Sequence, residues 1–247
     1  MERQKIFFTS DLHFGHDNVL RFDNRPFETV EEMDDELIKR WNDKVAKGDL
    51  VYVLGDLIWK TATNEAVKII KRLNGQIILI KANHDRFLHN AAAKKALAGI
   101  KDYDDISVML EDGTVRRCIL SHYFIPFYNG HRYNAIHLHG HSHFTAEATE
   151  ELRLTKALNE KGYNLEIYNV GCMYWNYEPV ALDEILKTKK RGHWHCSWGH
   201  CRLEGACSEF GKDSDFSPFY ADGIIAIDGC TAYSGKVNCI VLEDENI

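Results

Sequence analysis

The hydrophobic pattern of the first half of the chain alternates short apolar runs with segments whose apolar residues recur every three or four positions. The apolar runs, which are typical of strands covered on both faces, are residues 5–10, 50–55 and 76–81. Residues 28–45 and 64–75 have the helical spacing, and Asn64 is the expected N-cap of the second helix. This β-α-β-α-β order predicts parallel strands with helices packed outside the sheet.

The second half of the chain is richer in strand-like segments than in helices. A short Ala-rich helix is expected at residues 90–98 and a final helix at 181–190. The strand-like runs between them are residues 105–110, 115–120, 134–140 and 165–170. The sequence EDGT separates the first two of these runs and predicts a hairpin turn. Beyond residue 190 the composition shifts to Cys, Gly, Ser and aromatic residues, so we expect one domain at 1–188 and an appendage at 189–247.

Composition narrows the class of protein. The 247 residues are 45% hydrophobic, which is enough for one substantial core, and the formal net charge of −7 provides no general attraction for nucleic acid. No apolar run approaches the roughly 20 residues of a membrane helix, and the polar start lacks the apolar core of a signal peptide. An odd count of seven cysteines does not suggest a disulfide framework. We therefore expect a cytoplasmic protein without a membrane segment.

Polar residues with ligand chemistry follow five of the strand-like runs. They are Asp11 and His13, then Asp56, then Asn83, His84 and Asp85, then His122, and finally His141 and His143. Any one of these residues is more simply a turn former, a helix cap or a surface side chain. Five clusters at strand ends favour a shared site, because the carboxyl ends of parallel strands meet at one edge of a sheet.

The residue types suggest a pair of metal ions. Asp, Asn and His suit Mn, Fe, Zn or Ni, and the set contains no thiol, unlike a structural zinc site. Two cations about 3.5–4 Å apart can hold a hydroxide and clamp a phosphoryl group. An aspartate that bridges the cations would partly offset their repulsion.

The ordered motifs "DLH", "GD", "NHD", "SH" and "GHSH" resemble the signature of the calcineurin-like metallophosphoesterases. The resemblance covers roughly residues 5 to 188 and is greatest to small single-domain bacterial and phage members. It implies a four-layer α/β/β/α sandwich with two divalent metal ions. It also implies hydrolysis of phosphoester bonds, as a phosphatase or phosphodiesterase, by metal-bound hydroxide and without a covalent phosphoenzyme.

The resemblance also assigns roles to the motif residues. One implied metal site consists of Asp11, His13, Asp56 and His143. The other consists of Asp56, Asn83, His122 and His141, which makes Asp56 the bridge. His84 is the expected catalytic group beside the phosphate and Asp85 the residue that orients it. The expected substrate-binding residues are His16, Asn83 and His84.

Some positions near the motifs have a second interpretation. His16 either reaches the phosphate or belongs to a segment, "FGHDN", that caps a helix at residues 17–22. Arg25 and Arg86 suit phosphate oxygens, but solvated surface charges are the preferred interpretation. The family usually has Gly before "NHD", whereas this chain has Ala82, which fits if its φ is negative.

The tail contains a second group of ligand types. A tetrahedral zinc site could draw on His193, His195, Cys196, His200, Cys201 and Cys207, although their spacing matches no zinc motif. Its "GHWH" has the form of "GHSH", and the apolar runs "IIAI" and "NCIVL" predict strands. The tail resembles the C-terminal part of a second metallophosphoesterase that lacks the other motifs. We expect no independent catalysis there.

Two alternatives to a small-molecule hydrolase remain. A metal-binding scaffold without turnover would carry the same ligands, although it has no need of His84. A nuclease is disfavoured by the acidic balance and by the lack of interleaved basic and aromatic residues. The expected partner is a small phosphoester or nucleotide, and nucleic acid is not expected.

Overall fold

The computed structural model describes residues 3–59, 63–190, 219–221 and 224–226. The chain divides into two compact units, Met1–Ile185 and Leu186–Ile247, and each is described by itself.

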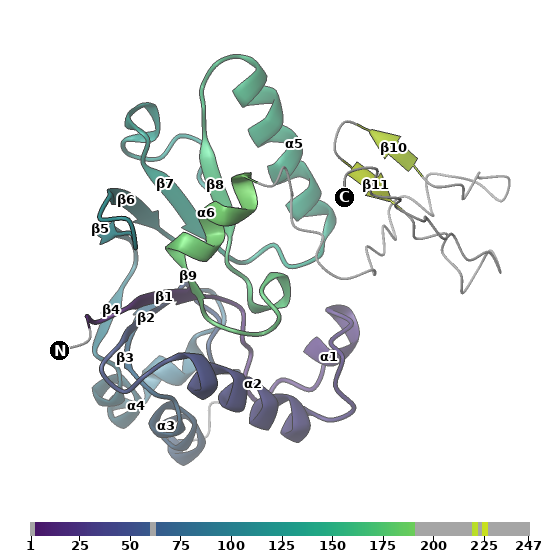
Figure 1. The fold of residues 1–247 in the computed structure, drawn as a ribbon. Helices are drawn as coiled ribbons and strands as arrows, with labels where there is room; N and C mark the ends of the chain where they lie inside the picture. Colours follow the sequence, from purple (N-terminus) through teal and green to yellow (C-terminus); the bar gives the residue numbers. More distant parts are fainter. Residues whose placement is uncertain (1–2, 60–62, 191–218, 222–223, 227–247) are drawn as a thin grey trace, which may run out of the picture. The chain divides into compact units, whose positions relative to one another are not determined.

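The first sheet has five strands in the order β4-β3-β2-β1-β9 (Figure 1). Its parallel strands are β1 (Ile6–Thr9), β2 (Leu50–Val53), β3 (Gln76–Ile80) and β4 (Gly99–Lys101). The short strand β9 (Val180–Ala181) runs antiparallel to β1. The three predicted apolar runs are therefore confirmed as neighbouring parallel strands.

Helices α2 (Val30–Lys44), α3 (Thr63–Arg72) and α4 (Ala91–Ala96) lie on one face of this sheet (Figure 1). Helix α2 buries Met33, Leu37 and Trp41 in the same core as the strand residues Val51 and Leu79. Such burial of large apolar side chains is the main favourable contribution to folding.

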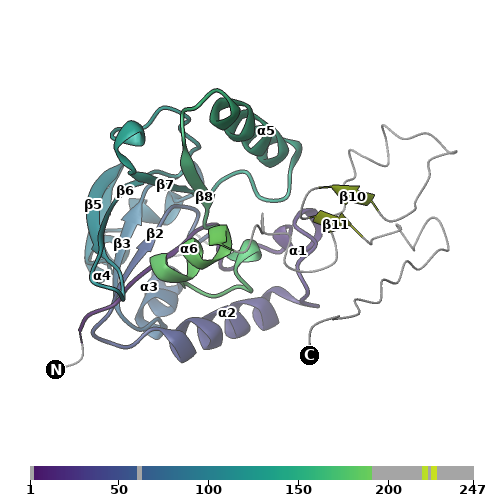
Figure 2. The same cartoon turned by 45° about the horizontal axis from the view of Figure 1, so that its top comes forward.

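The second sheet has four strands in the order β5-β6-β7-β8. They are β5 (Asp104–Met109), β6 (Val115–Leu120), β7 (Ile136–His139) and β8 (Glu166–Asn169). Strands β5 and β6 form the predicted antiparallel hairpin, and β6, β7 and β8 are parallel. Figure 2 shows the two sheets between α2 and α3 on one side and α5 (Ala146–Glu160) on the other. This is the α/β/β/α order that the family resemblance implied.

Shorter elements, and the helix that follows β9, complete the described part of residues 3–190. They are α1 (Val19–Phe22), η1 (Arg86–His89), η2 (His131–Tyr133), η3 (Cys172–Tyr174) and α6 (Leu182–Lys190). No helix in the described ranges is long and apolar enough to cross a membrane. Cys118 and Cys172 are buried free thiols, and burial raises the pKa of each to about 12.

Two helix predictions need correction. Helix α3 already includes Thr63, so Asn64 lies inside the helix and is not its N-cap. Helix α5 was not predicted, because its sequence has no apolar stripe: Thr155 is its one buried residue.

Part of the predicted tail lies within the described residues. Strands β10 (Phe219–Ala221) and β11 (Ile224–Ala226) form an antiparallel pair, and β11 contains most of "IIAI". The run "NCIVL" lies outside the described residues, as do His193, His195, Cys196, His200, Cys201 and Cys207. The assignment of residues 189–247 to an appendage derived from a second family member stays a prediction.

Candidate metal centre

Five of the seven predicted ligands have a backbone held at positive φ. Positive φ angles occur at Asp11 (57°), His13 (53°), Asp56 (52°), His141 (75°) and His143 (46°). Aspartate and histidine are enriched in this region, but each such residue still costs on the order of 1–3 kcal/mol. Strain of this kind clusters at functional sites, because the surrounding structure must hold the side chains in place.

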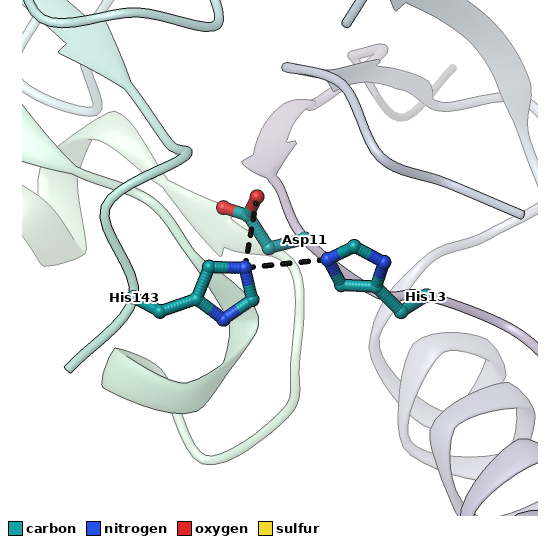
Figure 3. Close-up of side chains that lie close together, drawn as sticks. All are labelled: Asp11, His13 and His143. Atoms are coloured by element: carbon teal, nitrogen blue, oxygen red, sulfur yellow. Dashed lines mark hydrogen bonds and ion pairs between the residues drawn. The ribbon is translucent and has the colours of Figure 1, made fainter. Parts of the chain in front are cut away.

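Asp11, His13 and His143 form the first cluster, although they come from two different sheets (Figure 3). Nε2 of His143 lies 3.2 Å from Nε2 of His13 and 3.6 Å from Oδ1 of Asp11. Burial and the neighbouring His143 hold the pKa of His13 well below its ordinary value, so His13 is neutral. A neutral ring nitrogen that faces the ring nitrogen of another histidine needs a proton or a cation between the two.

Asp11, Asp56 and His122 form the second cluster. Oδ2 of Asp56 lies 3.7 Å from Nε2 of His122, and that nitrogen lies 3.2 Å from Nδ1 of His141. The other ring nitrogen of His122, Nδ1, is 2.7 Å from the carbonyl oxygen of Leu54. A bond from Nδ1–H to this carbonyl would leave Nε2 free to bind a cation.

Asp11 is common to both clusters, and the carboxylate of Asp56, a member of the second, also approaches His13 of the first. Its Oδ2 is 3.6 Å from Nε2 of His13 and 3.7 Å from Nε2 of His122. Burial, followed by repulsion from Asp11 and Asp85, raises the pKa of Asp56 to about 8. Cations beside a buried carboxylate reverse this effect, because they stabilise its ionised form. The donor set therefore fits divalent cations.

The loop after β3 places Asn83 and His84 beside the second cluster. The backbone N–H of His84 donates to Oδ1 of Asp56 at 3.1 Å. The Tyr123 hydroxyl donates to Oδ1 of Asn83 at 3.2 Å, which brings the amide next to the loop of His122. Burial, with the charge of Arg86 acting in the same direction, lowers the pKa of His84, so its imidazole is neutral near pH 7.

Asp85 has a different set of contacts from the one the motif suggested. Its carboxylate accepts hydrogen bonds from the backbone N–H groups of Asp56 (3.3 Å), Leu57 (3.0 Å) and Ala82 (2.9 Å). Asp85 thus joins the loops after β2 and β3. Among the described residues no hydrogen bond joins its carboxylate to the His84 side chain, so the expected orienting role of Asp85 stays a prediction and would act through the backbone.

Close backbone approach explains the glycines of two motifs. A Cβ at Gly140 would lie 1.9 Å from Oγ of Ser10 and 2.5 Å from Oδ2 of Asp11. A Cβ at Gly55 would lie 2.4 Å from Cβ of Ala82. Ala82 does not have a positive φ, which meets the condition under which alanine was expected to fit.

His16 lies at the edge of the first cluster. Its ring is stacked on Trp59, with centroids 3.8 Å apart and planes at 10°, and its centroid is 5.4 Å from that of His13. The residue at the N-cap of α1 is Asn18, and it makes no side-chain capping bond. This placement favours the substrate-binding interpretation of His16, which stays a prediction.

The sequence interpretation missed Asp23 and assigned Arg25 the wrong surroundings. Arg25 is only 5% exposed and donates to the carbonyl oxygens of Asp11 (2.6 Å) and Leu12 (2.8 Å) and to Oδ2 of Asp23 (2.9 Å). The preferred interpretation of Arg25 as a solvated charge is therefore wrong, and its contacts lie with the backbone that carries Asp11. Arg86 is exposed, as expected. Residue type alone does not distinguish a buried loop arginine from a solvated one.

The loop that carries His141 and His143 has its own support. Oγ of Ser142 donates to Oε2 of Glu151 at 2.7 Å and accepts from Nδ2 of Asn169 at 3.0 Å. The Tyr174 hydroxyl also donates to the carbonyl oxygen of His143. These bonds join the loop to α5, β8 and η3.

Known proteins resemble this chain over most of its length. The model of the calcineurin-like phosphoesterase family matches residues 4–219. An uncharacterised protein of Methanocaldococcus jannaschii is 33% identical over 207 residues, which are 78% of this chain and 95% of that protein. The Gene 66 protein of Mycobacterium phage D29 is 29% identical over 202 residues, which are 73% of this chain and 93% of that protein.

A solved structure resembles the fold. The crystal structure of a protein of unknown function from Aquifex aeolicus matches with a TM-score of 0.56 and 24% sequence identity. The match covers 75% of this chain and 99% of that chain. At this identity the likeness supports the fold alone.

Proposed function

The chain belongs to the calcineurin-like phosphoesterase family, and we propose that it hydrolyses phosphoester bonds of small molecules with the help of two divalent cations. The observation that carries this proposal is the place of Asp56, whose Oδ2 faces His13 of one cluster and His122 of the other. A carboxylate in this position can bind both cations at once. Shared charge of this kind offsets the repulsion between two neighbouring cations.

The proposed ligands divide between two cation sites. One site consists of Asp11, His13, Asp56 and His143, and the other of Asp56, Asn83, His122 and His141. Oxygen and imidazole donors suit Mn, Fe, Zn and Ni, and Mn is the first cation to test. When bound, the cations would activate a water molecule and neutralise charge on the phosphoryl oxygens.

The protein's own groups complete the proposed site. His84 is held beside the bridging carboxylate by its backbone bond to Asp56, and a neutral imidazole can donate an N–H to a phosphoryl oxygen. A phosphate group next to this ring would raise its pKa and so favour proton donation to the leaving oxygen. Asp85 keeps His84 in place by joining the two loops.

A panel assay tests this function. Protein stripped of metal is loaded with Mn²⁺, Ni²⁺, Fe²⁺ or Zn²⁺ and given nucleotides, cyclic nucleotides, aryl phosphomonoesters and aryl phosphodiesters. We expect hydrolysis that depends on added cation. Cation binding without hydrolysis of any member would overturn the proposal in favour of a metal-binding scaffold, and preferential cleavage of long DNA or RNA would favour a nuclease.

A further inference from the structure

Exposed aromatic side chains gather around the candidate metal centre. Seven aromatic residues among the described ones are exposed, and four of them lie in or beside the ligand loops: Phe22, Trp59, Tyr123 and Phe144. The first three contact rings of proposed ligand or substrate-binding residues, and we call these three the aromatic rim. Phe144 instead contacts Tyr174 and is not part of the rim.

Trp59 is the member closest to the proposed substrate-binding histidines. Its ring is stacked on His16 and its centroid lies 5.0 Å from that of His84, yet the residue is 40% exposed. The backbone N–H of Trp59 donates to the carbonyl oxygen of Phe14 at 3.0 Å, so the loop is fixed to the segment that carries His13 and His16. The exposed part of the indole therefore lies beside the place proposed for the phosphate.

Phe22 and Tyr123 extend this surface to the two cation sites. Phe22, which is 58% exposed, has its centroid 5.6 Å from that of His143. Tyr123, which is 48% exposed, has its centroid 4.7 Å from that of His141, and its hydroxyl bonds to Asn83. Three segments that are distant in the sequence thus each contribute one exposed ring to the same centre.

These rings contribute little to core packing, because much of each remains exposed to solvent. A single exposed aromatic residue needs no explanation, but a group of them beside polar catalytic residues is typical of a binding site. The ligand clusters supply contacts for the charged phosphate, whereas the rim supplies the flat faces of aromatic rings. Such faces bind flat rings by stacking, and this binding depends little on which base the ring belongs to.

We propose that the aromatic rim binds a planar heteroaromatic ring on the substrate, so that the substrate class is nucleoside phosphoesters. This inference rests on the proposed function, because it places the ring next to a phosphate held at the metal centre. The net charge of −7 disfavours long polyanions, which restricts the class to single nucleotides and short derivatives.

A matched pair of ligands tests the rim. Adenosine 5′-monophosphate and ribose 5-phosphate carry the same phosphate ester but differ in the base. With Mn²⁺-loaded full-length protein, kcat/KM is compared for the pair if it is hydrolysed, and Kd by calorimetry if it is not. We expect the base to raise kcat/KM, or to lower Kd, about tenfold, which is within the range of one stacked base.

Variants identify the residue responsible. Trp59→Leu should reduce the ratio between the two ligands to near one, whereas Tyr133→Leu, at an exposed residue outside the ligand loops, should leave the ratio unchanged. An equal constant for both ligands in the unaltered protein, or the same ratio after Trp59→Leu, would overturn the inference. Absence of hydrolysis across the whole panel would instead count against the proposed function. The inference about the rim would still be tested in that case, because Kd can be compared for the two ligands without hydrolysis.

Discussion

The carboxylate of Asp23 lies 3.2 Å from Nδ1 of His143, on the opposite side of the ring from Asp11. Burial alone would lower the pKa of His143, but the close contact with Asp23, together with the charges of Asp11 and Asp23, outweighs it and raises that pKa. The other oxygen of Asp23 accepts from Nε of Arg25. A carboxylate behind a histidine ligand fixes the ring and increases its basicity, so we propose that Asp23 acts on the proposed cation site through His143.

Replacement of Asp23 should therefore weaken cation binding. We expect Asp23→Ala to lower Mn²⁺ affinity about 10–100-fold, with a smaller loss for Asp23→Asn, because the amide keeps the size and one acceptor oxygen. Calorimetric titration of metal-free protein measures the change. Asp17→Asn, at an exposed residue on the other side of α1, is the control. Equal affinity in Asp23→Ala and the unaltered protein would exclude this role.

Removal of the Arg25 side chain should destabilise the fold. Arg25→Met leaves the buried carboxylate of Asp23 without its cation and two carbonyl oxygens without their donor. The expected loss is about 3–5 kcal/mol in the free energy of unfolding, measured with urea on metal-free protein. Arg21→Met, at an exposed position in α1, should change it by less than about 0.5 kcal/mol. Similar losses in both variants would show that the buried contacts of Arg25 do not account for its contribution to stability.

Replacement of His84 should separate chemistry from cation binding. Its side chain is a proposed proton donor and its contact with Asp56 is made by the backbone, so His84→Ala keeps that contact. We expect kcat to fall about 10²–10⁴-fold while Mn²⁺ affinity stays the same. His89→Ala, at an exposed histidine of η1, provides the comparison and should keep full kcat. An undiminished kcat in His84→Ala would remove this residue from the mechanism.

Glu151 should make the stability of metal-free protein depend on pH. Burial, with repulsion from Glu147 acting in the same direction, raises the pKa of Glu151 to about 7, above the value of about 4.3 expected in the unfolded chain. Between these values the folded state retains a proton that the unfolded state has released. Stability attributable to Glu151 is therefore highest below about pH 4 and falls as the pH rises to about 7.

Glu151→Gln should remove this fall. The free energy of unfolding is measured with urea at pH 5 and at pH 8. We expect the loss of stability between these pH values to be smaller in the variant by on the order of 1 kcal/mol. The difference is small because partial exposure of Glu151 screens its charge. The exposed Glu160 offers a control, and Glu160→Gln should follow the unaltered protein. If Glu151→Gln follows it too, the carboxyl of Glu151 is not protonated in the folded state at pH 5 to 7.

The sequence predicted those parts of the molecule that depend on local pattern. Strands β1, β2 and β3 are continuous apolar runs, and the loops after them carry motif residues at fixed spacing, so both could be recognised. Asp23 and Arg25 could not, because their importance comes from burial against Leu12 and His143, and no short-range pattern reports it. Helix α5 was missed for a related reason: its exposed surface leaves no periodic apolar signal.

Left-handed backbone at the ligands is also a property of the folded loops. The residues next to Asp56 and His141 in the sequence do not predict a positive φ at either position. Hydrogen bonds from His84 N–H to Asp56 and from His141 N–H to Asp11 hold their loops in position. These contacts connect segments far apart in the chain. The arrangement of the motif loops could be expected from strand order, whereas their conformation required the structure.

The central claim is that two neighbouring cations share Asp56, and electron paramagnetic resonance of the Mn²⁺-loaded protein tests it most directly. Mn²⁺ is suited to this test because the thiol-containing tail favours softer metals. We predict a spectrum of magnetically coupled Mn²⁺ ions for the unaltered protein and of isolated ions for Asp56→Asn. A spectrum of isolated ions in the unaltered protein at saturating Mn²⁺, or full coupling in Asp56→Asn, would contradict the account.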